Sequence, residues 1–117
     1  MAFYTDIIID QGSAYNVTVP VLTLNNLPLD LTEYSGRGQI RRNYNATLAV
    51  DFLVQVYGDP TDGLVRISLT PAQTAAMKAG RYVFDIEVYT ENDNDVIRVI
   101  EGQVTITPRA TQPSSGN

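Results

Sequence analysis

The stretch ISLTPAQTAAMKAGRYVFDIEV, residues 67–88, predicts a strand, one short helix and a second strand in a chain that otherwise alternates like a β protein. Thr70 is a suitable N-cap residue, Pro71 stands at the first helical position, and Gln73 completes a capping box. Good helix formers follow, most of them alanines. We therefore expect a helix over about residues 70–79 that crosses between two sheets.

Small side chains line one face of this expected helix. Ala72, Ala75, Ala76 and Ala79 are spaced to lie together against the edge of a sandwich, where alanines allow close packing. Gly80 predicts a left-handed stop at the end of the helix. The helix would close one end of the fold, which is a role that requires no catalytic group.

Period-two alternation predicts seven or so strands along the chain. Residues 48–57 show the clearest case, and residues 64–69 and 81–90 alternate in the same way. Pro20 cannot donate a backbone hydrogen bond, so its strand is expected at an edge or at a bulge. Gly102 predicts a bulge in the last strand. In residues 48–57 the side chains expected to point inward are Leu48, Val50, Phe52, Val54 and Val56.

Frequent turn signals between short strands are typical of an immunoglobulin-like fold. We expect a mostly β protein, an immunoglobulin-like antiparallel β-sandwich of about seven strands with one short helix. A single domain would cover residues 1–108. The polar residues 109–117 would form a flexible C-terminal tail.

Composition removes several classes of function. The chain has 117 residues, no Cys, no His and no Trp, and a net charge of −5. Without Cys or His it has no disulfide, no thiol nucleophile and none of the commonest ligands for zinc. The acidic balance argues against nucleic-acid binding, and no apolar run is long enough for a membrane span or a signal peptide. We expect no cofactor.

Acidic residues offer two candidate sites, each with a simpler interpretation. Residues 91–95 present oxygen ligands for Ca²⁺, but they lack the glycine and glutamate positions of an EF-hand and are interpreted as a plain turn. Asp85 and Glu87 lie on one expected outer face, as a glycosidase pair would. Nothing near them in the sequence would raise a pKa, so we expect neither catalysis nor a metal site.

Five residues are candidates for partner contacts. Arg37, Arg41 and Arg42 are clustered in an acidic chain, and they form either a solvated strand face or a docking surface for an acidic partner. Tyr57 and Tyr89 fall on expected outer faces. They are either contact residues or partly buried side chains of a two-layer fold.

Four segments, in order, resemble one family: IIIDQGSAYNVTV, LPLDLTEYSGRGQIRRNY, ISLTPAQTAAMKAGRYVFDIEV and VIEGQVTITPRAT. They are similar to the turns, the capped helix and the closing strand of small β-sandwich proteins from tailed bacteriophages and prophages. The resemblance covers about residues 5–110. Gly36 and Gly38 depart from the bulkier alternation of that family. The shared motifs are structural, and none carries catalytic chemistry.

The resemblance implies a non-enzymatic structural protein of a tailed phage particle, assembled in the host cytoplasm. We expect a tail, baseplate or fibre-attachment component that contacts other virion proteins and further copies of itself. A head decoration protein is the alternative within this class. A module that recognises host-surface glycans through exposed tyrosines, alone or with Ca²⁺, is an alternative of another class, and a small hydrolase has the least support.

Overall fold

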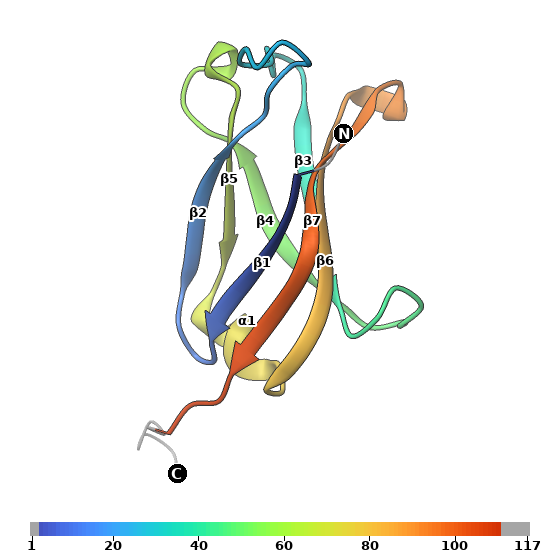
Figure 1. The fold of residues 1–117 in the computed structure, drawn as a ribbon. Helices are drawn as coiled ribbons and strands as arrows, with labels where there is room; N and C mark the ends of the chain where they lie inside the picture. The colour runs from blue at the N-terminus through green and yellow to red at the C-terminus, as the bar shows by residue number, and fades with distance from the viewer. Residues whose placement is uncertain (1–2, 111–117) are drawn as a thin grey trace.

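A computed structural model describes residues 3–110 of the chain and shows seven strands and one short α-helix (Figure 1). The predictions of a mostly β protein, of about seven strands and of one short helix are confirmed. Two short 3-10 turns, Pro60–Asp62 and Glu91–Asp93, lie in loops. The elements are β1 Phe3–Asp10, β2 Tyr15–Pro20, β3 Ser35–Arg41, β4 Ala49–Val56, β5 Leu64–Leu69, α1 Pro71–Ala76, β6 Gly80–Tyr89 and β7 Val96–Thr107.

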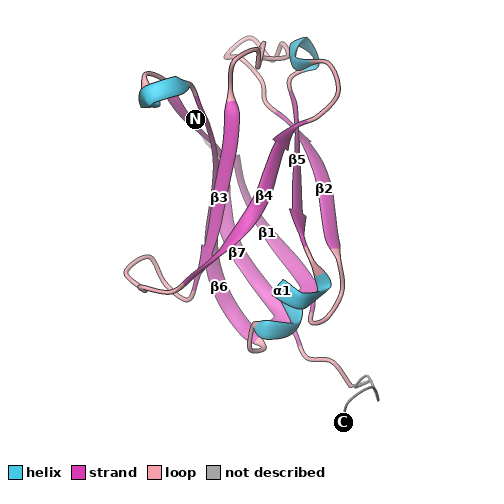
Figure 2. Cartoon of the chain, turned by 180° about the vertical axis from the view of Figure 1, so that it is seen from behind, coloured by secondary structure: helices cyan, strands magenta, loops and turns pink. Residues whose placement is uncertain are grey.

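The strands form one sheet in the order β1-β7-β6-β3-β4-β5-β2, which curls until its two ends face each other (Figures 1 and 2). The sheet is mixed, whereas an antiparallel sandwich was predicted, because β1 pairs with β7 in parallel. A parallel pair requires a long connection between its strands, and here the rest of the domain supplies it. The remaining pairs are antiparallel.

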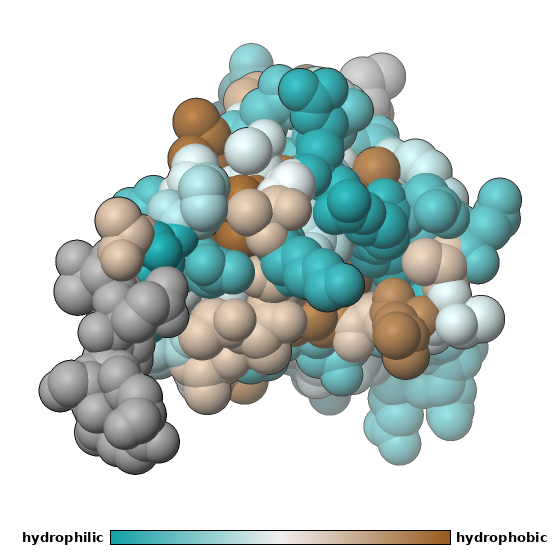
Figure 3. Space-filling view, turned by 90° about the horizontal axis from the view of Figure 1, so that it is seen from below, coloured by the Kyte–Doolittle hydropathy of each residue, from teal (hydrophilic) through white to brown (hydrophobic). Residues whose placement is uncertain are grey.

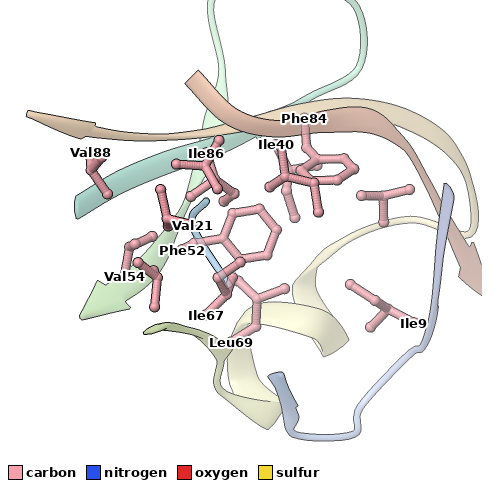
Figure 4. Packing of buried hydrophobic residues seen from close by; sticks show 14 of the residues in the cluster. Ile9, Val21, Ile40, Phe52, Val54, Ile67, Leu69, Phe84, Ile86 and Val88 are labelled. Atoms are coloured by element: carbon pink, nitrogen blue, oxygen red, sulfur yellow. The ribbon is translucent and has the colours of Figure 1, made fainter. Parts of the chain in front are cut away.

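The inward-facing side chains from the two facing halves of the curled sheet form a single core (Figure 4). Phe52 on β4 and Phe84 on β6 meet edge to face at its centre, with 6.0 Å between ring centroids. Gly38 faces inward beside Phe52, and Gly36 faces inward beside Val54. A Cβ atom at Gly38 would lie 2.3 Å from the Ile86 Cδ1 atom, so the neighbouring side chains occupy the space of the expected bulkier residues.

The inward alternation predicted for residues 48–57 and 64–69 is confirmed for most positions. Leu48 is the exception, because it precedes β4 and is 85% exposed. The edge position predicted from Pro20 is also confirmed, since β2 ends the strand order.

The helix is shorter than predicted and turns another face inward. Thr70 and Gln73 form the predicted capping box, but α1 ends at Ala76 and the next residue, Met77, is extended. Met77 leaves the helix because its side chain joins the core, and Gly80 begins β6 instead of stopping the helix. The predicted packing of the alanine face is wrong, because all four alanines are exposed; α1 lies at the end seen in Figure 3, where apolar and polar surface are mixed.

Thr74 anchors α1 to the turn between β1 and β2. Its side chain is fully buried, and its hydroxyl accepts from the Gly12 N–H at 3.0 Å and donates to the Ser13 carbonyl at 2.8 Å. Gln11 donates from its side-chain amide to the Met77 carbonyl at 2.8 Å. These bonds attach the helix to the first turn of the chain, which is 61 residues away in sequence.

The bulge in β7 lies three residues before the predicted site. Ile86 pairs with Ile100 whereas Glu87 pairs with Arg98, so Val99 is the extra residue. Gly102 instead lies beside Thr5 of β1 in the parallel pair. A Cβ atom at Gly102 would be 1.7 Å from the Thr5 carbonyl oxygen. Glycine is therefore required here by the close approach of two backbones.

We predict that Gly102→Ala lowers the free energy of unfolding by about 3 kcal/mol or more, because β1 must move away from β7. Urea unfolding measures the change. Gly58→Ala is the control, because Gly58 also has a positive φ but no atom lies within 4 Å of the position that a Cβ would take; it should cost only about 1–2 kcal/mol of backbone strain. Equal losses in the two variants would contradict the close approach.

We predict that Thr74→Val destabilises the fold by about 1–3 kcal/mol, because it leaves the Gly12 N–H and the Ser13 carbonyl without their partner at nearly constant volume. Thermal unfolding followed by circular dichroism checks this. Thr18→Val on the exposed side of β2 makes the same chemical change at a surface site and should be neutral within about 0.5 kcal/mol.

Candidate binding groove

The arginines predicted as a contact cluster are engaged within the fold. Arg37 forms an ion pair and a hydrogen bond with Glu87, and its Nη1 lies 3.4 Å from Asp93 Oδ1. Its guanidinium also lies 4.2 Å from the ring centroid of Tyr89. The structure therefore brings Arg37 and Tyr89 together, two of the five candidate contact residues.

Arg41 and Arg42 have other neighbours. Arg41 donates to the Ala46 carbonyl and to Gln39 Oε1, the latter at 2.8 Å. Arg42 lies 5.0 Å from the ring centroid of Tyr82, beyond the end of β3. The three arginines thus hold rings and loops at separate places along one strand, and their role as partner contacts stays a prediction.

Tyr57 is 46% exposed, and Tyr89 is half-buried. The Arg66 guanidinium lies 5.7 Å from the centroid of the Tyr57 ring. Both tyrosine rings therefore have a guanidinium on one face. A bound sugar would have to use the other face or displace the arginine.

A shallow hollow of about 460 Å³ lies over β3, β4 and β6, and polar residues of the outer face line it together with glycines and apolar residues. Gln39 donates to Asp51 across β3 and β4 at 2.8 Å. Asp85 and Glu87 share this face as predicted, but Glu87 is paired with Arg37. Desolvation raises the pKa of Asp85, against the opposing charge of Arg98. Among residues 3–110, no group of three or more acidic side chains is arranged to hold a metal ion.

A larger groove lies between β1 and β2, the two ends of the strand order, and sequence reasoning missed it. We call it the seam groove. Its volume is about 790 Å³ and its lining is mostly apolar. Figure 1 shows the two strands diverging from their shared turn near α1. The lining residues are Phe3, Thr5, Asp6, Ile7, Ile8, Tyr15, Val17, Val19, Pro20, Val21, Leu22, Asn26, Ile67, Ile97, Arg98, Val99 and Ile100.

The core itself forms the floor of the seam groove. Buried side chains of both sides of the fold reach it, among them Ile67 of β5 and Ile100 of β7. Exposure along the inward side of β1 falls from 70% at Phe3 to 2% at Ile9. The groove therefore narrows toward α1 and is open at the other end. Burial also raises the pKa of the Tyr15 phenol on its wall.

Both walls of the seam groove are unpaired strand edges. The Val21 N–H donates to the Gly63 carbonyl at 2.7 Å, in continuation of the β2–β5 register. Because antiparallel ladders alternate, the backbone groups of Asn16 and Thr18 point away from β5, toward the free edge of β2 beside the groove. The Gln11 N–H donates to the Thr107 carbonyl at 3.1 Å. By the same alternation, the backbone of Ile8 on β1 points to the free edge.

Two sequence signals pointed toward this groove without defining it. Pro20 indicated an edge strand, and the run Ile7-Ile8-Ile9 cannot turn all of its side chains inward in a strand. Ile8 is accordingly exposed and Ile9 buried. Which strands form the two ends of the sheet depends on pairings between distant residues, and periodicity carries no information about them.

Comparisons with known proteins add little to this geometry. No protein-family model matches the chain, and no curated protein matches it. Among solved structures, InlP of Listeria monocytogenes is similar over 91% of this chain, with 13% sequence identity and a TM-score of 0.48. This chain covers 28% of the InlP chain. The TM-score is too low to carry an argument about function. Within residues 3–110, no helix has the length and apolar character that crossing a membrane requires.

We predict that Arg37→Met lowers the free energy of unfolding measured in urea, through loss of the ion pairs and of the ring contact. The loss should shrink in 1 M salt, because the ion pairs are partly exposed and are screened. Arg81→Met, which removes an exposed arginine with no ion pair or ring contact among the described residues, is the control. Identical losses in the two variants would contradict a structural role for Arg37.

Proposed function

We propose that this protein is a structural component of a tailed phage particle, acting at the tail, the baseplate or a fibre attachment through contacts with other virion proteins. The observation that carries the proposal is the seam groove, an apolar surface between two unpaired strand edges. Such edges are assembly surfaces in β proteins. The proposal is further supported by the ordered resemblance of four segments to phage structural proteins.

The remaining surface agrees with assembly as the main activity. Arg37 is paired with Glu87 and lies against the Tyr89 ring, and Arg42 lies against the Tyr82 ring, so both charges have partners within the fold. Exposed apolar side chains lie in the connections between strands, such as Leu24 and Leu48. Exposed apolar residues next to polar ones are common at surfaces that join proteins.

We expect that gold-labelled antibody raised against the protein marks the tail end of purified particles in electron micrographs. Antibody absorbed beforehand with the protein is the control for specific labelling. Mass spectrometry of the same particles, washed in high salt, detects the chain even where its surface is covered in the assembly. Label over the head would instead support a decoration protein. Absence of the chain from washed particles, with free protein in the lysate, would contradict a virion role.

A further inference from the structure

We propose that the seam groove accepts an extended segment of a partner protein as an added strand beside β2. The segment would carry apolar side chains at every second position and at least one Lys or Arg. This inference goes beyond the proposed function, because it concerns the chemistry of the bound segment and holds for any partner, inside or outside a particle. Its test uses the purified chain and is independent of antibody labelling.

The backbone of β2 is the first reason. Within residues 3–110 no strand pairs with its outer edge, where the N–H and carbonyl groups of Asn16 and Thr18 point away from β5 beside the groove. An added strand can pair with these groups, as in other cases of strand addition. An apolar small molecule would cover the groove but would leave the same backbone groups without partners.

The unequal number of strands on the two sides of the fold also favours an added strand beside β2. On the side of the fold that holds β2, only β5 and β4 continue the sheet, whereas β1, β7, β6 and β3 lie on the other side (Figure 2). The inner side chains at the end of the shorter side, Val17 and Val19, are half-exposed because no further strand covers the space beside them. A strand added there would extend this layer over the exposed part of the core.

The side chains of the groove specify the pattern of the segment. Residues of an added strand alternate between the core and solvent. The inward set would meet Ile7, Val17, Val19, Ile67 and Ile97, which are all aliphatic. We therefore assign the inward positions of the segment to aliphatic or aromatic residues and the outward positions to polar ones.

Charge assigns the basic residue and argues against a second copy of this chain. The groove is lined by two charged residues, Asp6 and Arg98. Arg98 Nη1 lies 3.3 Å from Glu101 Oε1, and Arg98 Nε lies 3.8 Å from Asp85 Oδ2. The charge of Arg98 is therefore compensated. Asp6 takes part in none of the ion pairs found among residues 3–110. Its carboxylate is therefore complementary to a cationic side chain of the segment.

A second copy would bring another chain of net charge −5 to the groove, and the repulsion between like charges opposes this. The chain's own residues 111–117 are polar and contain Pro113, so their sequence lacks the alternating apolar side chains. A different protein that supplies an alternating, basic segment is thus the occupant that the groove favours.

The experiment selects ten-residue peptides that bind the full chain from two displayed libraries. The first library alternates apolar and polar positions, with Lys and Arg among the polar choices. The second has the same composition with apolar positions at helical spacing. We expect enrichment from the alternating library alone, with Lys or Arg over-represented in the selected peptides. Enrichment from neither library, or equally from both, would overturn the proposal.

Variants of β2 then locate the binding edge. Thr18→Pro removes a donor from the free edge and leaves the β2–β5 ladder unchanged, whereas the matched Thr18→Val keeps the donor. We expect the selected peptide to bind Thr18→Pro at least tenfold more weakly and Thr18→Val within twofold of the original chain. Asp6→Asn should weaken binding several-fold and reduce its dependence on salt. Unchanged binding to a folded Thr18→Pro would overturn pairing with β2.

A change in the peptide tests the same point if Thr18→Pro does not fold. N-methylation of alternate peptide amides removes the donors of one edge of the peptide at a time. We expect that methylating at least one of the two alternate sets abolishes binding to the unchanged chain. Binding that tolerates both sets would overturn strand addition. A sedimentation experiment in which the chain alone dimerises, and Thr18→Val dimerises but Thr18→Pro does not, would make a second copy the occupant and overturn the partner segment.

Discussion

The close approach of β1 to β7 at Gly102 is the constraint on which the rest of the arrangement depends. The Thr5 carbonyl lies where a side chain of residue 102 would start, so the parallel pair forms only because that residue is glycine. This contact holds β1 on the β7 side of the fold. The following strand, β2, pairs with β5, and the two consecutive strands do not form a hairpin. The seam groove is the consequence of this separation.

The buried hydroxyl of Thr74 determines the shape of that groove. It bonds to two consecutive residues of the β1–β2 turn, Gly12 and Ser13, and so holds this turn against α1. The strands meet at this end and separate toward the other, as the falling exposure from Phe3 to Ile9 records. A short helix in a β protein thus has a structural task, which is to close one end of the seam between its outermost strands.

Local chemistry explains which features could be predicted from the sequence. The capping box of Thr70 and Gln73 involves neighbours in the chain, and its prediction is confirmed. The alternation of residues 64–69 is equally local. The exposed alanine face, the bulge at Val99 and the seam groove depend on contacts between distant residues, such as Met77 with the core. Mutual engagement of Arg37 and Tyr89 belongs to this second group, because it requires the register of β3 on β6.

The free edge of β2 is protected from pairing with other strands at its two ends but not at its centre. Pro20 removes a backbone donor at the open end of β2. At the closed end, the hydrogen bond between Gly12 and Thr74 occupies the turn. The backbone between them, at Asn16 and Thr18, remains available over a short window. A long, fully free edge would pair with many exposed strands and lead to aggregation. A short window beside one uncompensated carboxylate restricts the register and the charge of whatever pairs with it, and so confers selectivity on an otherwise generic interaction.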